Sequence, residues 1–478
     1  MRTVAVIGGG IGGLAASYYL SKVPQITKVV LLESTGRYGG WLSSTRTSDG
    51  AVFEHGPRGI RPVGPAGHNT LNLVEDLDLT KEILPVTSHH VASKNRYLFV
   101  NKQLYRMPSG ISGVFRTVPP FSRPLITHAV MEMLRKKGNG EDESIHSFVS
   151  RRLGKELADI VADAFCRGVF AGDSKKLSIQ ACFPSVFDAE QRAGSVILGM
   201  LLGSGPSPAV SPGSLAQRAM KESWAQWSLS RGMEALPEAM TDYLAQGGRV
   251  QLHKQAPVKH ICPSTGSPSW EIHVEDETVL VDHIVSAVPA KVLSSVLPSC
   301  CQLLIEHLRQ ISTVTVAVVN LEYEGSVVPA PGFGHLVPSS EDRGVLGVVY
   351  DSLVFPQHNR QTGQTTRLTV MMGGAWFQEV FGDPDQVPVE HLRTVATRAV
   401  QCHLGISTMP SWSHVAVQKD CIPQYHVGHR HRVESIRNYI RTNRLPLSLV
   451  GASYEGVSVS DVIFSGRTAV EELCGRRL

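Results

Sequence analysis

Three glycines near the start of the chain have the spacing of a phosphate-binding turn. Gly8, Gly10 and Gly13 follow the apolar run 3–7 and fit G-x-G-x-x-G, with a helical pattern after them. The first glycine of such a motif allows a tight turn, the second lets the backbone approach a pyrophosphate, and the third lets the helix pack close to the strand. The helix N-terminus then offers free N–H groups to the phosphates. The pattern predicts a dinucleotide site, to which we also assign Gly9, Ile11 and Gly12.

A carboxylate lies where such a fold uses one to hold a ribose. The run 27–34 predicts a second strand, and Glu33 near its end follows Gly13 by twenty residues. A carboxylate at that distance accepts hydrogen bonds from ribose hydroxyls and repels a 2′-phosphate, which disfavours NADP. We assign Glu33 and the adjacent Ser34 to the site. The alternative is a glycine-rich turn that binds no ligand.

Two further loops with glycines and arginines follow directly. GRYGGW covers 36–41, where plain NAD dehydrogenases usually have only a connection, and FEHGPRGIRP covers 53–62. The first resembles the R-x-G-G element of amine oxidase-like flavoproteins, which runs beside the pyrophosphate and flavin. The second is similar to the loop that lines the isoalloxazine ring in that family. The resemblance implies cofactor contacts for Arg37, Gly40, Trp41, Gly56, Pro57, Arg58 and Gly59. For Arg58 and Arg61, ordinary surface salt bridges are the alternative.

The end of the chain predicts a second helix at the same site. Val457, Ser458 and Val459 should present backbone N–H groups at the start of a helix that continues to Leu473. Gly466 costs this helix about 1 kcal/mol against alanine, which makes sense where another backbone must come close. In amine oxidase-like flavoproteins this helix start meets the flavin, so the resemblance implies that both chain ends hold FAD. It also implies contacts for Ala452, and for Val258 beside the adenine. A loose terminal helix is the alternative.

The elements that must position these residues predict an α/β fold. The chain should form a loop and an amphipathic helix over 227–244, and then return to the nucleotide domain through two runs of alternating apolar and polar residues, at 249–261 and 269–289. We expect several strands within 313–376 and an amphipathic helix over 389–404. The Pro/Gly/Ser stretch 203–214 is the best internal boundary. We expect a discontinuous Rossmann-like FAD-binding domain (1–90, 240–300 and 415–478), a mostly helical membrane-associated subdomain (91–205) and a mixed-sheet substrate-binding domain (206–239 and 301–414).

Composition excludes several classes of protein. The net charge of +4 is too small to indicate a nucleic-acid partner, and the eight cysteines show neither a CxxC pair nor a disulfide framework. The spacing of His, Cys and acidic residues predicts no metal site. No apolar run reaches the roughly 20 residues of a membrane-spanning helix, and the first strand begins too early for a cleavable presequence. Residues 102–137 hold seven Lys/Arg and one acid among apolar residues, which favours contact with an anionic membrane surface; a solvated loop is the alternative.

Longer strings narrow the resemblance. The chain resembles the protoporphyrinogen oxidases of the mitochondrial animal type over essentially its whole length. The most specific similar strings are GPRGIRP, NRYLFV, CRGVFAG, FGHLVPSSEDRGVLGVVYDS, CIPQY and GASYEGVSVSD. The resemblance implies FAD-dependent oxidation of protoporphyrinogen IX to protoporphyrin IX with three O2, the penultimate step of heme synthesis. It also implies a homodimer on the intermembrane-space side of the mitochondrial inner membrane, without a cleaved presequence, and transient contact with ferrochelatase.

The substrate is a large apolar macrocycle with two propionates, so its pocket should be apolar with a cation at the mouth. The run 95–107 predicts a hairpin closed by Asn101 and Lys102, with Arg96 at the start of its first strand. The resemblance pairs Arg96 with a propionate, which a guanidinium suits bidentately; a surface arginine is the alternative. It also assigns Phe333, Leu336, Met371, Val349 and Ile422 to the macrocycle, although their spacing fits plain sheet core as well.

Two rival functions remain open from the residues alone. An FAD-dependent amine oxidase would need an aromatic cage and a lysine near the flavin, and neither is located in the sequence. A non-catalytic tetrapyrrole carrier would not need the pyrophosphate glycines. No residue is assigned as a catalytic base, because the histidines have no carboxylate support recognisable in the sequence.

Overall fold

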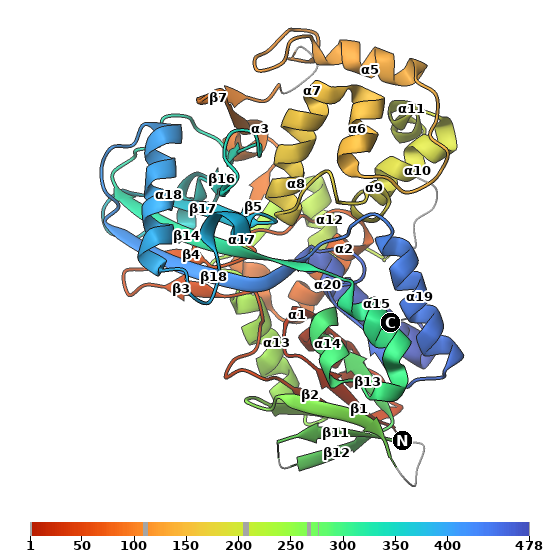
Figure 1. The fold of residues 1–478 in the computed structure, drawn as a ribbon. Coiled ribbons are helices and arrows are strands. Elements are labelled where there is room, and N and C mark those ends of the chain that lie inside the picture. Colours follow the sequence, from red (N-terminus) through yellow and green to blue (C-terminus); the bar gives the residue numbers. More distant parts are fainter. Residues whose placement is uncertain (1, 109–112, 204–209, 265–268, 276, 478) are drawn as a thin grey trace.

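A five-stranded parallel sheet lies toward one end of the molecule (Figure 1). The computed structural model describes residues 2–108, 113–203, 210–264, 269–275 and 277–477. The strand order is β19-β13-β1-β2-β9, and every neighbouring pair is parallel. The strands are β1 (Arg2–Ile7), β2 (Ile26–Leu32), β9 (Val250–His253), β13 (His283–Ser286) and β19 (Leu447–Leu449). In such a sheet the carboxyl ends of all strands meet at one edge, where nucleotides bind.

Alternate residues of β1 face two different cores. Val4 and Val6 pack with the helices α1 (Ile11–Ser21), α2 (Gly64–Asp76), α12 (Ser214–Lys221), α13 (Ala235–Gln246) and α20 (Val459–Cys474). Ala5 and Ile7 face the other side. That side is covered by the antiparallel sheet β10 (Val258–Pro263), β11 (Trp270–Val274) and β12 (Glu277–Val281) and by α14 (Ala290–Val296), α15 (Gln302–Arg309) and α19 (His429–Thr442). The period-2 alternation of a strand therefore supplies both faces of the predicted nucleotide domain.

A seven-stranded mixed sheet forms the second layer, in the order β18-β14-β17-β16-β15-β6-β7. Its strands are β6 (Tyr97–Val100), β7 (Gln103–Arg106), β14 (Thr313–Glu324), β15 (Gly334–Leu336), β16 (Val345–Val349), β17 (Thr365–Gly374) and β18 (Trp412–Pro423). One face packs against α18 (Val389–Leu404), which has the predicted bounds. The predicted hairpin is confirmed: β6 pairs with β7, and Asn101 and Lys102 both have positive φ, as its two-residue turn requires.

Short helices form the end of the molecule opposite the parallel sheet (Figure 1). They are α5 (Leu125–Leu134), α6 (Ile145–Leu153), α7 (Lys155–Leu157), a π-turn (Ala158–Ala162), α8 (Asp163–Phe170), α9 (Ile179–Cys182), α10 (Pro184–Ala193) and α11 (Val196–Leu201). Fully buried Arg152 donates to Glu132 Oε1 over 2.8 Å, and Ser195 donates to Glu132 Oε2 over 2.6 Å. This buried pair ties α5, α6 and the start of α11 together.

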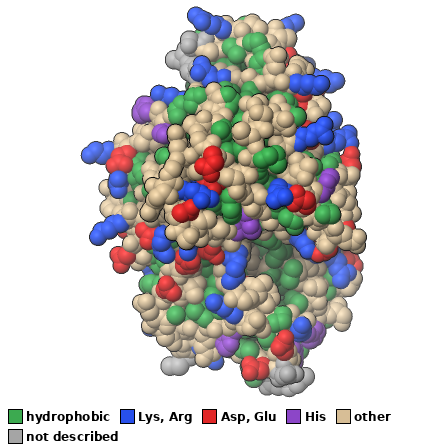
Figure 2. All heavy atoms as spheres, turned by 90° about the vertical axis from the view of Figure 1, so that its left-hand side faces the viewer, with side chains coloured by type: hydrophobic (Ala, Val, Ile, Leu, Met, Phe, Trp, Pro, Cys, Tyr) green, Lys and Arg blue, Asp and Glu red, His purple; other side chains and the backbone are tan. Residues whose placement is uncertain are grey.

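The outer face of this helical end carries both apolar and basic side chains. Figure 2 shows hydrophobic side chains there with Lys and Arg beside them. The exposed apolar residues of α5 and α11 are Val130, Met131, Met133, Leu134, Leu198, Met200 and Leu201. No helix of the described ranges is long and apolar enough to cross a membrane. Of the basic segment 102–137, residues 109–112 lie outside the described residues.

The remaining elements connect these layers. They are β3 (Ser44–Arg46), β4 (Val52–Glu54), β5 (Ile83–Thr87), β8 (Trp224–Leu229), α3 (Val91–Lys94), α16 (Asp351–Val354), α17 (Phe377–Phe381) and 3-10 turns at Leu79–Glu82, Ser299–Cys301 and Pro356–His358. One local expectation is wrong: 224–229, which overlaps the expected loop at the start of 227–244, is strand β8 and pairs with β5. Pairing with a strand more than a hundred residues away decided its conformation.

Three segments lie elsewhere than their assigned domains suggest. Within 206–239, the buried residues from Leu215 to Leu236 share one core with α1 and α2. Within 91–205, β6 and β7 join the seven-stranded sheet. Within 415–478, the end of β18 belongs to that same sheet. Of the expected boundary 203–214, residues 204–209 lie outside the described residues.

Candidate cofactor and substrate site

The glycine turn between β1 and α1 has the geometry of a phosphate cradle. Gly8 has φ +98°, and a Cβ on Gly13 would lie 1.8 Å from the Gly8 carbonyl oxygen. Larger residues are therefore excluded at both positions. A Cβ on Gly10 would meet nothing closer than the Gly40 Cα at 3.8 Å, so the space where a side chain would lie is open. The Gly9 N–H donates to Glu33 Oε2 over 2.7 Å, which fixes this carboxylate beside the turn.

The loop 36–41 runs alongside this turn. Gly10 and Gly39 form a parallel bridge, and the Gly39 N–H donates to the Gly9 carbonyl over 2.9 Å. Arg37 donates to the carbonyl oxygens of Gly40 and of Leu42 and so holds its own loop closed. Two loops of glycine-rich backbone therefore lie side by side where a pyrophosphate would be held.

The first turn of the C-terminal helix lies beside the start of α1, because a Cβ on Gly12 would lie 3.0 Å from Val462 Cγ1. A Cβ on Gly466 would lie 2.9 Å from the Ala16 nitrogen and 3.2 Å from the Gly12 oxygen, so α20 and α1 touch through backbone. One expectation needs a correction: Ser458 caps α20 in a capping box with Asp461, and its N–H donates to that carboxylate over 3.3 Å. The box engages this N–H within the helix cap, whereas we expected it to face a ligand.

Other residues of the predicted cofactor set lie around this centre. The Ala256 N–H donates to the Glu33 carbonyl over 2.8 Å, which brings the start of β10 and its first residue Val258 to Glu33. Ser34 is exposed beside it. Tyr425 donates its hydroxyl proton to the Ala452 carbonyl. Val457 packs against the helical end of the molecule.

The loop 56–59 connects the glycine loops to the seven-stranded sheet. A Cβ on Gly56 would lie 2.4 Å from the Trp41 oxygen, so this loop crosses directly beside Trp41. Pro57 follows Gly56 in this loop. A Cβ on Gly59 would lie 3.2 Å from the side-chain oxygen of Gln226. Gln226 belongs to the two-stranded sheet β5–β8, and Arg58 of the same loop contacts Met371 of the seven-stranded sheet. The loop thus connects the cofactor cradle to both sheets.

Arg58 forms a buried ion pair at this junction. Its Nη1 lies 2.6 Å from Asp351 Oδ1, and both side chains are 11% exposed. The Thr369 hydroxyl lies 2.7 Å from Asp351 Oδ2 and 2.7 Å from Asn320 Oδ1. Asp351 was not predicted as a site residue, although an acid directly after a predicted strand was the available signal.

Glu54 is a second buried acid near this junction. Desolvation raises its pKa to about 7, against the lowering effect of hydrogen bonds from Ser44 and from the Met233 N–H. Its backbone carbonyl accepts a hydrogen bond from Asn320, which connects it to the polar residues around Asp351. The carboxyl therefore changes protonation near neutral pH.

Four of the six predicted substrate residues share one face of the seven-stranded sheet. Met371 pairs with Gly347 and Val318, Val349 pairs with Gly334, and Ile422 pairs with Val314. Leu336 also pairs with Gly347. Because directly paired residues point to the same side of a sheet, Leu336, Val349, Met371 and Ile422 lie opposite the face that packs on α18. This face looks toward Arg58, whose Nη2 lies 3.8 Å from Met371 Sδ.

The same residues are distributed over three apolar clusters. Phe333 and Val349 pack with Phe355, Leu336 packs with Leu98, and Met371 and Ile422 pack with Ala171. Helix α8 lies directly on this face, because a Cβ on Gly168 would come within 2.6 Å of Leu336. Gly168 and Ala171 both belong to the string CRGVFAG, yet we had assigned neither to the site.

Arg96 lies beside Phe333, with its Cζ 5.8 Å from the ring centroid. Burial and the neighbouring Arg61 both lower the pKa of Arg96. Across the ranges that the structure describes, neither arginine has a carboxylate partner. A guanidinium group without a carboxylate partner is available to bind an anion.

The buried histidines have structural partners. His335 lies 2.9 Å from the Tyr350 hydroxyl and 3.0 Å from His403, and burial lowers its pKa. His146 does have a carboxylate partner, Asp159, at 2.7 Å, but it lies in the helical part. No catalytic base is assigned among the described residues.

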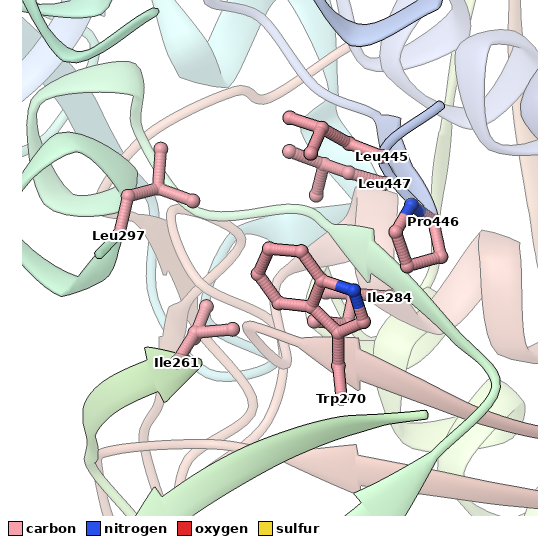
Figure 3. Close-up of a pocket in the computed structure, with 7 residues that line it drawn as sticks. All are labelled: Ile261, Trp270, Ile284, Leu297, Leu445, Pro446 and Leu447. Atoms are coloured by element: carbon pink, nitrogen blue, oxygen red, sulfur yellow. The ribbon is translucent and has the colours of Figure 1, made fainter. Parts of the chain in front are cut away.

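Two cavities lie away from these residues. Figure 3 shows a cavity of about 10 Å³ between the two sheets of the nucleotide domain, lined by Ile261, Trp270, Ile284, Leu297, Leu445, Pro446 and Leu447. It is apolar and too small for an organic ligand. A polar cleft of about 510 Å³ lies between the helical part and the seven-stranded sheet, with Asp159, Arg343 and Trp376 in its lining. Neither cavity includes a predicted site residue.

Comparison with known proteins gives one family. The family of flavin containing amine oxidoreductases matches residues 11–474. Human protoporphyrinogen oxidase is 47% identical over 99% of this chain and 98% of its own. Among solved structures, one from Exiguobacterium has a TM-score of 0.79 at 21% identity, covering 99% of this chain and 98% of its own. Cyclohexylamine oxidase from Brevibacterium oxydans has a TM-score of 0.68 at 14% identity, covering 99% of both chains. These two structures are similar in fold.

Proposed function

This chain belongs to the protoporphyrinogen oxidase family of flavin containing amine oxidoreductases, and we propose from this membership that it oxidises protoporphyrinogen IX to protoporphyrin IX with bound FAD. The protein is an FAD-dependent oxidoreductase of heme biosynthesis. The observation that carries the proposal is the joint glycine cradle of α1, the loop 36–41 and α20, which leads directly to an apolar sheet face through the loop of Arg58. We further propose that oxidation of one protoporphyrinogen IX molecule consumes three O2 and releases three H2O2.

The residues around the cradle fit FAD. Gly8 and Gly13 allow the tight turn between β1 and α1, and the space beside Gly10 is open for phosphate. The N-terminus of α1 would direct its positive dipole end to that space. The Gly9 N–H holds the Glu33 carboxylate in position, and Glu33 would bind the ribose hydroxyls from there. When bound, FAD supplies the acceptor for a hydride from the macrocycle.

The sheet face opposite α18 would hold the macrocycle. Leu336, Val349, Met371 and Ile422 offer apolar contact on that face, and α8 packs on the part of it around Leu336. Arg96, with Arg61 near it, would bind a propionate at the edge beside Phe333. A fixed anion contact at one end orients a rigid macrocycle, so the same ring carbon is presented at each oxidation.

An anaerobic reduction tests the proposal. The purified FAD-loaded protein is mixed with protoporphyrinogen IX without oxygen, and flavin absorbance and porphyrin fluorescence are followed together. We expect the oxidised flavin band to bleach as porphyrin fluorescence rises. A flavin band that stays oxidised with the porphyrinogen but bleaches with amines would support the amine oxidase function. A band that bleaches with neither, while porphyrin still binds, would support the carrier function.

The helical end of the molecule is the proposed membrane-docking region. Exposed apolar residues of α5 and α11 lie beside Arg135, Lys136 and Lys137, and this combination suits an anionic bilayer surface. We assign the protein to mitochondria and propose the intermembrane-space side of the inner membrane as its site. A homodimer and transient contact with ferrochelatase are part of the same proposal.

The proposed domain division follows from the same layers. The FAD-binding domain would take 1–90, 240–300 and most of 415–478, and the packing of α12, β8 and α13 on α1 and α2 supports adding 214–246. The substrate-binding domain would take 301–414 together with β6 and β7. The helical subdomain would keep the part of 91–205 that follows β7.

A further inference from the structure

Four potential metal ligands lie on one face of the sheet β10–β11–β12. His260 pairs with His273, and Cys262 pairs with Glu271, across antiparallel strands. The intervening pair, Ile261 and Ile272, points into the apolar core of the nucleotide domain. Because alternate residues of a strand face opposite sides, the four polar side chains share the side away from that core.

Three of these side chains already bring their donor atoms together. Cys262 Sγ lies 3.4 Å from His273 Nε2 and 3.9 Å from Glu271 Oε2, and those two atoms lie 3.6 Å apart. Zinc bonds of about 2.0–2.3 Å in a tetrahedral arrangement place ligand atoms about 3.3–3.6 Å from one another. The observed separations are within a few tenths of an ångström of that arrangement.

A neighbouring hydroxyl orients the imidazole for this role. The Thr278 hydroxyl lies 3.1 Å from His273 Nδ1, on the strand directly opposite. A hydroxyl that accepts the Nδ1 proton leaves Nε2 with a free lone pair, and Nε2 is the atom that faces Cys262 and Glu271. The side chains of His273 and Glu271 are 36% and 26% exposed, so an ion can enter from solvent.

We propose that Cys262, Glu271 and His273 bind one Zn²⁺ ion, with water in the fourth position. Thiolate and imidazole ligands favour zinc over Mg²⁺ and Ca²⁺, which prefer oxygen ligands alone. The centroid of the His260 ring lies 5.9 Å from that of His273 on the same face. The ion would join β10 to β11, away from the cofactor cradle.

Zinc binding is measured on the full-length FAD-loaded protein under a phosphine reductant. Zn²⁺ is buffered with a chelator so that weak sites on surface histidines stay empty, and bound zinc is counted per protein. We expect one equivalent in the wild type and in the control Cys300→Ser, whose cysteine is exposed and outside the cluster. Affinity should fall at least about tenfold in Cys262→Ser and in His273→Gln, and less in His260→Gln.

Two readouts identify the ligand directly. The extended fine structure of the zinc X-ray absorption spectrum should show a sulfur ligand at about 2.3 Å. This sulfur ligand should be missing in Cys262→Ser. In the wild type, which requires no variant to fold, Zn²⁺ should slow alkylation of Cys262 but not of Cys300. Equal affinity in wild type and Cys262→Ser, no sulfur neighbour, or unchanged alkylation of Cys262 would each overturn the site. None of these readouts depends on oxidase activity.

Discussion

Arg58 and Asp351 form an ion pair at the junction of the cofactor loops and the seven-stranded sheet. The two charged atoms lie 2.6 Å apart, and both side chains are 11% exposed. The pair is largely buried, unlike the surface salt bridge that was the alternative interpretation of Arg58. Because the loop 56–59 also crosses Trp41, this pair fixes the distance between the proposed flavin site and the proposed substrate face.

Asp351→Asn should destabilise the protein strongly. It leaves the Arg58 charge buried without its partner, which typically costs about 3–5 kcal/mol. We expect a lower free energy of unfolding and a lower flavin content at equal protein concentration, measured by denaturant titration and visible absorbance. Asp242→Asn, at an exposed acid of α13, is the matched control. If both variants unfold at the wild-type denaturant concentration, the pair does not hold the junction.

Gly466→Ala should separate the two helices that form the cradle. The new Cβ would lie 2.9 Å from the Ala16 nitrogen, which is backbone and cannot move aside. Overpacking of this kind costs about 1–3 kcal/mol, and the FAD dissociation constant should rise with it. The control is Gly247→Ala, where the nearest atom is 3.6 Å away. Unchanged FAD affinity in Gly466→Ala would show that α20 does not contribute to the cradle.

Arg96→Ala should raise KM for protoporphyrinogen IX more than it lowers flavin content. A hydrogen bond to a charged partner contributes about 1.5–3 kcal/mol, so we expect KM to rise about tenfold or more. Arg96→Lys should recover part of the loss, since it keeps the charge but not the bidentate geometry. Steady-state kinetics and the flavin-to-protein ratio measure both effects. Loss of FAD in parallel with activity would make Arg96 a structural residue.

The exposed leucines of the helical end should contribute to vesicle binding. Leu134 is 81% exposed and Leu201 77% exposed. Replacing both by serine should reduce co-sedimentation with vesicles that contain anionic lipid, and Lys136→Gln with Lys137→Gln should make binding weaker at low salt. Met409→Ser is the matched control, because Met409 is 76% exposed on a different part of the molecule. Equal sedimentation of all variants would contradict the membrane assignment of this face.

The sequence predicted those features whose determinants are local. The glycine turn, the Asn101–Lys102 hairpin and the helix 389–404 depend on residues within one element or one turn, and all three are present. The junction could not be predicted, because Arg58 and Asp351 are 293 residues apart and no periodicity relates them. The proposed zinc ligands were not predicted from the sequence for a related reason. Cys262, Glu271 and His273 match no ligand spacing along the chain, and only antiparallel pairing brings them together.

Glu54 should make stability depend on pH in a direction that a substitution can reveal. Burial raises its pKa from the ordinary value of 4.5 to about 7, so the folded protein binds a proton more tightly than the unfolded chain between these values. Stability from this group therefore falls as pH rises through that window and is lowest above about pH 7. Glu54→Gln is neutral at every pH and can still accept from the Met233 N–H.

The variant should consequently be more stable than the wild type at about pH 8, by up to about 3 kcal/mol. Its advantage should shrink steadily toward about pH 5, where the wild-type carboxyl is protonated in the folded state. Denaturant unfolding of both proteins across this range gives the difference in unfolding free energy, in which the other titrating groups cancel. A difference that does not vary with pH would mean that Glu54 stays ionised in the folded protein, held by Ser44 and Met233 against its burial.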